Sequence, residues 1–325
     1  MSVKITASRY NTLQQRISAI MGVTTTGAPT TGYGQTVNSD VHYPIAGNFL
    51  SNGNLTDKID DQQYKDLYID IVRARVHQIG ASAFTIDPFV VGDYNANPIT
   101  VDKVEESYIS NLESLMTTIE TNKFSLHIPT QASLENLLTS GGSPVLSSRA
   151  TAWNGSIFHI FTVTFASAVA RRHFFNAGGQ IRLAAGITYS GLEQKTLQWQ
   201  SALSTMGVIS FDANSTFSNA AIGTGSAIGN YQVINTYQTV YTRAVGGLYG
   251  GSFYRIDALS NSTTTVQFRV GFNDLDVENV DENVQGTISS NISIARPDGS
   301  VNINGTNYNT VVISPAPTGS TTTNL

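Results

Sequence analysis

Nowhere does the sequence gather more chemically useful side chains than in ARRHFFNAGGQIRL, residues 170–183. Arginines, a histidine and two phenylalanines beside a Gly-Gly step could together bind a ligand. A structural interpretation competes with this one: a helix ends near Asn176 and Gly178, which suit the left-handed conformation, and a strand begins at Gln180. The phenylalanines would then close one end of a β-sandwich. We favour the structural role, because helix caps and aromatic plugs are far commoner than binding sites.

Two further stretches could bind ions. GTGSAIG, residues 223–229, has the glycines of a phosphate loop, but a β-like segment follows it where a helix N-terminus is needed, so we expect a flexible loop. NDLDVENVDEN, residues 273–283, alternates carboxylates that could chelate Ca²⁺. It lacks the glycine and the distal glutamate of an EF-hand, so a solvated loop is favoured and calcium is the alternative. The carboxylates are Asp274, Asp276, Glu278, Asp281 and Glu282.

No grouping of residue types typical of an enzyme stands out. The chain has no cysteine, no Gly-x-Ser-x-Gly motif, and few carboxylates between residues 150 and 270 for a glycosidase pair. The five histidines stand singly, without the close spacing of a zinc site, at His42, His77, His127, His159 and His173. We therefore expect a protein that is not an enzyme and that has no cofactor and no metal.

The composition bounds the partners. The 325 residues carry a net charge of −5 and only 13% charged side chains, which argues against nucleic acid, since phosphate contacts need clustered Lys and Arg. The N-terminal residues lack the apolar core of a signal peptide, and no run of about 18 apolar residues occurs. We expect a protein made in a cytoplasm, with no membrane partner and a neutral polar surface suited to packing against other proteins.

Three short amphipathic helices are predicted before residue 125. The first two share the pattern Tyr-x-x-Leu-x-x-x-Ile, and the third carries apolar residues from Tyr108 to Ile119, so we expect a weak repeat of a helical hairpin. Helices this short depend on packing. We therefore predict that their apolar stripe forms an assembly face toward other chains, made by Tyr10, Leu13, Ile17, Tyr64, Leu67 and Ile71.

After a Ser/Gly/Pro-rich segment the hydrophobic period changes from 3.6 to 2 residues, as in strands. A helix over 192–207 is also expected, with Leu197, Leu203 and Met206 on one face. The fold class predicted is α+β, a helical N-terminal domain followed by an antiparallel β-sandwich-like domain. The expected boundaries are 1–136 for the helical domain, which we expect to serve assembly and to anchor the protein in a larger assembly, 137–152 for a linker, 153–315 for the sandwich and 316–325 for a flexible tail.

Several segments resemble the structural proteins of tailed bacteriophages, especially those of cyanophage-type myoviruses. The segments are ITASRYNTLQQRISAIMG, YKDLYIDIVRARVHQIG, ARRHFFNAGGQIRL, LQWQSALSTMGVISFDAN, YQTVYTR and VQFRVGFND. The resemblance covers most of the chain. It implies a virion protein without enzymatic activity that assembles as a symmetric multimer in the tail, neck or baseplate, with copies of itself and other virion proteins as partners.

Two alternatives to a structural virion protein stay open. A carbohydrate-binding or receptor-contacting fibre-type module would need exposed aromatic side chains on one sandwich face, and would have a host-surface glycan as partner. The candidate surface contacts for it are Tyr189, Tyr249, Phe253 and Tyr254. A polysaccharide hydrolase would need paired carboxylates in a groove and has the least support.

Overall fold

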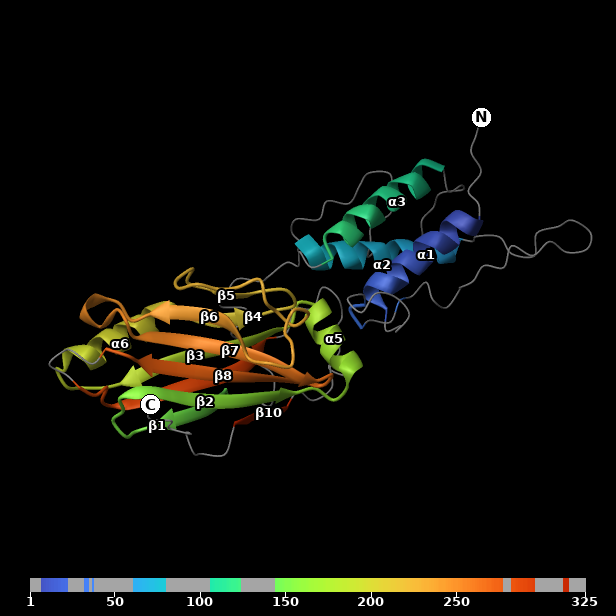
Figure 1. Ribbon diagram of the computed structural model, residues 1–325. Helices are drawn as coiled ribbons and strands as arrows, with labels where there is room; N and C mark the ends of the chain where they lie inside the picture. The colour runs from blue at the N-terminus through green and yellow to red at the C-terminus, as the bar shows by residue number, and fades with distance from the viewer. Residues whose placement is uncertain are drawn as a thin grey trace, which may run out of the picture. The chain divides into compact units, whose positions relative to one another are not determined.

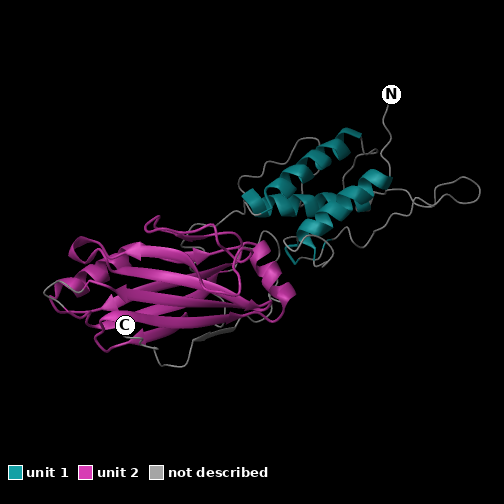
Figure 2. Cartoon of the chain, in the orientation of Figure 1, with its two compact units in different colours: residues 1–129, 298–307 teal, residues 130–297, 308–325 magenta. Residues whose placement is uncertain are grey.

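The computed structural model describes residues 7–22, 32–34, 37, 61–79, 106–123, 144–276, 282–295 and 312–315. The chain divides into two compact units (Figure 2): unit 1 comprises Met1–Pro129 and Asp298–Asn307, and unit 2 comprises Thr130–Pro297 and Tyr308–Leu325. Helices form the N-terminal part and two antiparallel sheets the C-terminal part (Figure 1). The predicted α+β class is confirmed.

In unit 1 the helices α1 (Ala7–Met21), α2 (Asp61–Ile79) and α3 (Glu106–Thr121) pack against one another and run parallel. Tyr10 near the start of α1 donates a hydrogen bond to the carbonyl of Gln63 near the start of α2, at 2.8 Å. Gln78 near the end of α2 donates to the carbonyl of Ile119 near the end of α3, at 2.7 Å. The hairpin interpretation is therefore wrong, because parallel helices require the chain to return between them, which accounts for the long intervals 22–60 and 80–105.

The predicted assembly face is instead the core of unit 1. All six of its residues are at most 3% exposed, namely Tyr10, Leu13, Ile17, Tyr64, Leu67 and Ile71. The expectation that this stripe faces other chains is wrong, because the three short helices bury one another's apolar faces. Ile109, Leu112, Met116 and Ile119 supply the third side.

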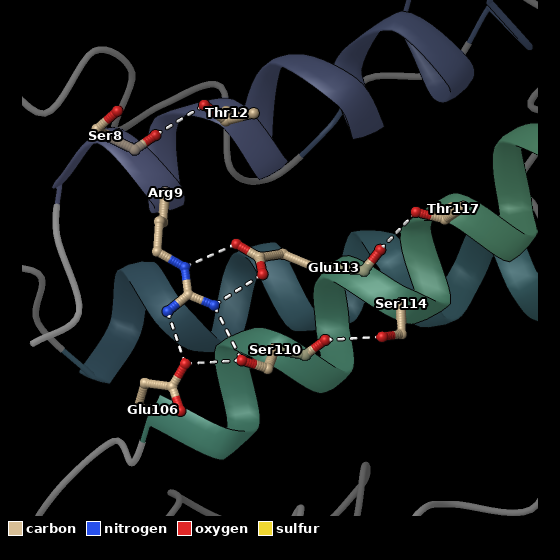
Figure 3. A network of polar contacts seen from close by, with 8 residues as sticks. All are labelled: Ser8, Arg9, Thr12, Glu106, Ser110, Glu113, Ser114 and Thr117. Atoms are coloured by element: carbon tan, nitrogen blue, oxygen red, sulfur yellow. Dashed lines mark hydrogen bonds and ion pairs between the residues drawn. The ribbon is translucent and has the colours of Figure 1, made fainter. Parts of the chain in front are cut away.

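Charged side chains fix α1 beside α3. Arg9 donates to both carboxylate oxygens of Glu113, at 2.8 and 2.7 Å, and to Glu106 at 2.9 Å (Figure 3). Two turns further along, Arg16 pairs with Glu120 in the same bidentate way. The arginines and the glutamates each repeat at intervals of seven residues, which returns them to nearly the same side of a helix. Hydrogen bonds from Arg9 hold the pKa of the Glu113 carboxyl below its usual range.

Unit 2 is a sandwich of two five-stranded sheets. Sheet 1 has the order β1 (Val145–Arg149), β9 (Thr287–Ala295), β3 (Gln180–Thr188), β4 (Ile209–Phe211) and β5 (Thr216–Ser218). Sheet 2 has the order β10 (Val312–Pro315), β2 (Gly155–Thr164), β8 (Thr265–Asp274), β7 (Phe253–Ser262) and β6 (Gln238–Ala244). Helix α5 (Ala168–Asn176) joins β2 to β3, and α6 (Gln194–Met206) joins β3 to β4.

The inner faces of the sheets meet through aromatic rings. Phe211 of sheet 1 lies edge-on to Phe268 of sheet 2, with ring centroids 5.1 Å apart. His159 of β2 also points inward and lies 2.9 Å from the Ser290 hydroxyl of β9 through its Nδ1. Because alternate side chains of a strand face the core, the contact between His159 and Ser290 is a polar contact between the sheets that is buried among apolar side chains.

The expected linker 137–152 contains a strand. Residues 145–149 form β1, which pairs with β9 from Val145 opposite Ile292 to Arg149 opposite Ile288. The Ser/Gly/Pro composition suggested a linker, but alternating VLSSR suits an edge strand, with every second side chain exposed. The predicted tail, 316–325, lies outside the described residues.

The glycine-rich stretch 223–229 closes one side of the sandwich. Thr224 bridges to Thr242 of β6, and Ser226 bridges to Thr216 of β5, so the segment pairs with an edge of each sheet. Gly223 has a φ of +83°, and a side chain there would collide with the ring of Tyr241. The expectation of a flexible loop is wrong, because the glycines permit close backbone pairing.

The buried histidines predict a pH-dependent stability. Burial, with a smaller contribution from Arg149, lowers the pKa of His159 to about 4, and burial also lowers that of His173 to about 4. In the unfolded chain each titrates near pH ~6.5. Between these values the unfolded state binds the proton and the folded state does not, so stability is present above pH ~6.5 and is lost as the pH falls toward ~4.

We expect the free energy of unfolding to fall by about 2 kcal/mol per buried histidine between pH 7 and pH 5. Denaturant titrations at several pH values measure this slope. His159→Asn keeps a hydrogen-bonding group for Ser290 and removes the titration, so it should roughly halve the slope. An unchanged slope in this variant would contradict the assignment.

Candidate functional site

The run 170–183 forms a capped helix and the start of a strand. Ser167 caps α5 by accepting a hydrogen bond from the amide of Ala170, and Gly178 follows the helix with a φ of +89°. The amide of Gly179 donates to the carbonyl of Phe174 at 2.8 Å, as in a Schellman turn. Phe174 and Phe175 are both fully buried and pack against Phe165. The structural interpretation fits these contacts.

Arg171 joins α5 to the rest of the sandwich. Its Nη1 donates to the Ser260 hydroxyl at 2.7 Å and to the carbonyls of Ser262 and Thr265, at the turn between β7 and β8. Its Nε donates to the Asn230 amide oxygen at 2.7 Å. Burial lowers the pKa of Arg171 to about 10, because these acceptors carry no formal charge. The guanidinium thus holds three segments together.

A second buried cation lies at the other end of the sandwich. Lys195 of α6 is fully buried, and its Nζ lies 2.8 Å from Oδ2 of Asp274, which is equally buried. The same ammonium donates to the carbonyl of Asp276 at 2.9 Å and to that of Glu282 at 3.2 Å. Three N–H groups therefore meet three oxygen acceptors. The ring of Tyr249 lies 5.4 Å from the ammonium.

In the described part of the acidic stretch 273–283, a carboxylate and two carbonyl groups bind the Lys195 ammonium. Asp276 is engaged separately by the amides of Gly251 and Ser252, at 3.0 and 3.1 Å. Burial raises the pKa of the Asp274 carboxyl, and the contacts with Lys195 and Ser252 oppose that rise. Residues 277–281, with Glu278 and Asp281, lie outside the described part of the chain.

The cluster contains a serine, a lysine and aspartates, but its geometry does not suit catalysis. Ser252 is fully buried, donates to Asp274 at 3.0 Å and accepts from the amide of Leu275 at 3.1 Å. A nucleophilic serine needs a base that takes its proton and an open path to a substrate. Here the hydroxyl donates to a carboxylate that is already paired with Lys195. These polar contacts therefore hold α6 to the end of β8.

Two of the predicted surface aromatics belong to the core. Tyr249 is 1% exposed and Tyr254 is fully buried, so their assignment as surface contacts is wrong. Tyr254 alternates with half-buried Phe253 along β7 and packs against Phe272, while Tyr249 lies in a short 3₁₀ turn (Gly247–Tyr249) beneath Lys195. Tyr189 is also half-buried, at the end of β3.

The outer face of sheet 2 carries a cluster of aromatic side chains that was not predicted from the sequence. The Arg269 guanidinium lies 5.1 Å from the ring of Phe158 and 4.2 Å from that of Tyr237, and donates to Asp257 at 2.9 Å. The ring of Phe158 lies against Gly271, where an added Cβ atom would come within 3.0 Å of that ring. Alternation along β2 turns Phe158 away from buried Ile157 and could have indicated this, but its neighbours on other strands could not be inferred.

Comparison of the chain with protein-family models, curated proteins and solved structures finds no match. Among the described helices none is both long and apolar enough to cross a membrane. Within the described residues no three His, Asp or Glu side chains are grouped so that they could hold a metal ion.

Lys195 and Asp274 give a testable stability difference. Lys195→Met leaves the Asp274 carboxylate buried without its counter-charge, and we expect a loss of about 3–5 kcal/mol in the free energy of unfolding. Lys195→Met combined with Asp274→Asn should lose less than the single variant, because no isolated charge remains. Equilibrium denaturation measures both, with Gln194→Met on the exposed side of α6 as the control. A double variant that is less stable than Lys195→Met would contradict this account.

Proposed function

We propose that this chain is a non-enzymatic structural protein of a tailed-phage virion, made in the host cytoplasm and assembled as a symmetric multimer in the tail, neck or baseplate. The observation that carries the proposal is the use of the charged side chains of unit 2. Lys195, Asp274 and Arg171 are buried and hold segments of the sandwich together. We expect a structural protein to use its charged side chains for such internal contacts, and the sequence resemblance to virion proteins supports the same role.

The composition of the surface supports the same role. Only 13% of the residues are charged. A surface of neutral polar groups loses less hydration energy than a charged surface does when it is covered by another protein. The proposed anchoring by the helical unit stays a prediction, but the apolar faces of α1 and α2 are already buried and cannot serve it. Apolar side chains exposed on unit 2 are the better candidates.

Mass spectrometry of purified particles of the phage that encodes this chain tests the proposal. We expect the chain in every particle at a fixed copy number, and antibody labelling in the electron microscope at one station on the tail, neck or baseplate. Absence from purified particles, or a copy number that varies with the wash, would refute a structural role. The capsid protein measured in the same digest provides the internal standard.

A second candidate function is glycan binding by the outer face of sheet 2. It is favoured by the half-buried rings of Phe158, Tyr237 and Phe253, which lie beside Arg269 and Arg255. Aromatic rings offer flat apolar contact to a sugar ring, and guanidinium groups donate hydrogen bonds to its hydroxyls. The predicted fibre-type module would thus use this face and not Tyr249 or Tyr254.

Binding of the full-length protein to purified host surface polysaccharide, followed by calorimetry, tests this second function. Phe158→Ala with Tyr237→Ala should weaken binding at least tenfold, which corresponds to about 1.4 kcal/mol. Phe217→Ala, a half-buried phenylalanine of β5 in the other sheet, is the matched control and should bind as the wild type does. No measurable binding by the wild-type protein would exclude the glycan function for that polysaccharide.

A further inference from the structure

The strand register fixes which side chains share the outer face of sheet 2. Phe158 of β2, Gly271 of β8 and Arg255 of β7 lie in one row across three neighbouring strands. In the next row Arg269 of β8 stands directly opposite Asp257 of β7. The two rows are on the same face, because side chains two residues apart along a strand point the same way. An aromatic ring, two guanidinium groups and a carboxylate are therefore neighbours on this face.

Side-chain contacts join these rows to the edge of the sheet. The Arg269 guanidinium lies 5.1 Å from the ring centroid of Phe158 and 4.2 Å from that of Tyr237, the residue before β6. The Tyr237 hydroxyl donates to Gln267 at 2.6 Å, and Gln267 donates to the Thr162 hydroxyl of β2 at 3.2 Å. All five side chains are partly exposed. A continuous surface with two aromatic rings and several hydrogen-bonding groups thus crosses from β2 to the start of β6.

This surface carries positive charge in excess. Oδ2 of the buried Asp257 lies 2.9 Å from Nη2 of Arg269 and 3.1 Å from Nε of Arg255, so one carboxylate faces two guanidinium groups. Strands β2, β6, β7 and β8 contain one other carboxylate, that of Asp274, which is fully buried against Lys195. The side chains of Arg255 and Arg269 are 27% and 29% exposed. Unlike Asp257, both arginines can reach a ligand in the solvent.

Arg255 keeps unused hydrogen-bond donors on this surface. Arg269 donates to Asp257 through Nε and Nη2, whereas Nε of Arg255 forms only an ion pair with the same carboxylate. Among the described residues Arg255 finds no hydrogen-bond acceptor. A guanidinium group presents its N–H groups as a planar fork, which binds a carboxylate through two parallel hydrogen bonds. The fork of Arg255 therefore fits an anionic group that a ligand supplies.

We propose that the outer face of sheet 2 binds an acidic polysaccharide, with sugar rings on Phe158 and Tyr237 and a sugar carboxylate on Arg255. This inference rests on the second candidate function, glycan binding, and adds the class of glycan and the residue that selects it. The ring of Phe158 lies against Gly271, which separates it from Arg255 in the row. Neighbouring strands are about 4.8 Å apart. A sugar stacked on Phe158 therefore brings its substituents within reach of the Arg255 fork.

The small amount of excess charge favours this ligand over nucleic acid. Nucleic acids carry closely spaced phosphates and need clustered Lys and Arg, whereas this face offers Arg255 and Arg269 with one carboxylate between them. One carboxylate per sugar matches one unpaired guanidinium. The net charge of −5 on the whole chain does not oppose such a contact strongly, because charges more than about 10 Å away are largely screened at 0.1 M salt.

Calorimetry on the full-length protein tests the inference with oligogalacturonate and with the same fragments after their carboxyl groups have been reduced to alcohols. We expect the wild type to bind the acidic fragments at least tenfold more tightly, a difference of about 1.4 kcal/mol that shrinks as salt is added. Arg255→Gln should bind both forms equally, at the affinity of the wild type for the reduced form. Arg255→Lys keeps the charge without the fork and should lose part of the preference. Arg149→Gln, at a partly exposed arginine of sheet 1, is the control and should keep it whole.

Three outcomes would overturn the acidic ligand: equal wild-type affinity for both forms, no binding of the acidic fragments, or a preference that persists in Arg255→Gln. Equal circular dichroism spectra and thermal transitions verify that the variants fold. If the wild type binds the host polysaccharide while the acidic fragments gain nothing over the reduced ones, glycan binding stands and the acidic preference is wrong. Tighter binding of oligothymidylate than of the acidic fragments, lost in Arg255→Gln, would assign the face to nucleic acid instead.

Discussion

The ammonium group of Lys195 is the contact on which the order of the sandwich depends most. The chain leaves sheet 2 after β8 and enters sheet 1 at β9, which lies between β1 and β3. The two sides of this crossing, at Asp276 and Glu282, are bound by the same ammonium that pairs with Asp274. Loss of the cation would free the crossing and leave a buried carboxylate unpaired, which is costly in a low-dielectric interior. One side chain of α6 thus fixes the chain where it passes from sheet 2 to sheet 1.

A second crossing between the sheets, from β2 to β3, also contains a buried cation. It contains α5, and Arg171 of that helix binds Asn230 and the turn between β7 and β8. Both of these crossings therefore have one buried cation that binds chain segments distant in sequence. The difference lies in the acceptors, since a carboxylate neutralises Lys195 while neutral oxygens surround Arg171.

How far the sequence predicts this structure depends on how local the determining contacts are. The change of period and the cap after Phe175 are local, and the α+β class and the helix-to-strand step at 170–183 follow from them. The core face of α6 was only partly predictable: Leu203 and Met206 are buried as expected, but Leu197 is exposed and Lys195 is fully buried. The oxygen atoms that make its burial favourable belong to residues about eighty positions away, Asp274 and Asp276. The parallel direction of α1, α2 and α3 likewise rests on contacts between distant residues.

The chain has few charged residues, and several of them are buried inside the two units. Of 18 Lys and Arg and 23 Asp and Glu, several are withdrawn from the surface, among them Asp70, Arg171, Lys195, Asp257 and Asp274. What remains gives a small net charge, so the electrostatic repulsion between copies is weak. For a protein that works alone in solution this would favour unwanted association, particularly with Leu192 and Leu248 exposed. For a protein whose surface is covered by neighbours in a particle, weak repulsion and exposed leucines such as Leu192 and Leu248 both favour assembly.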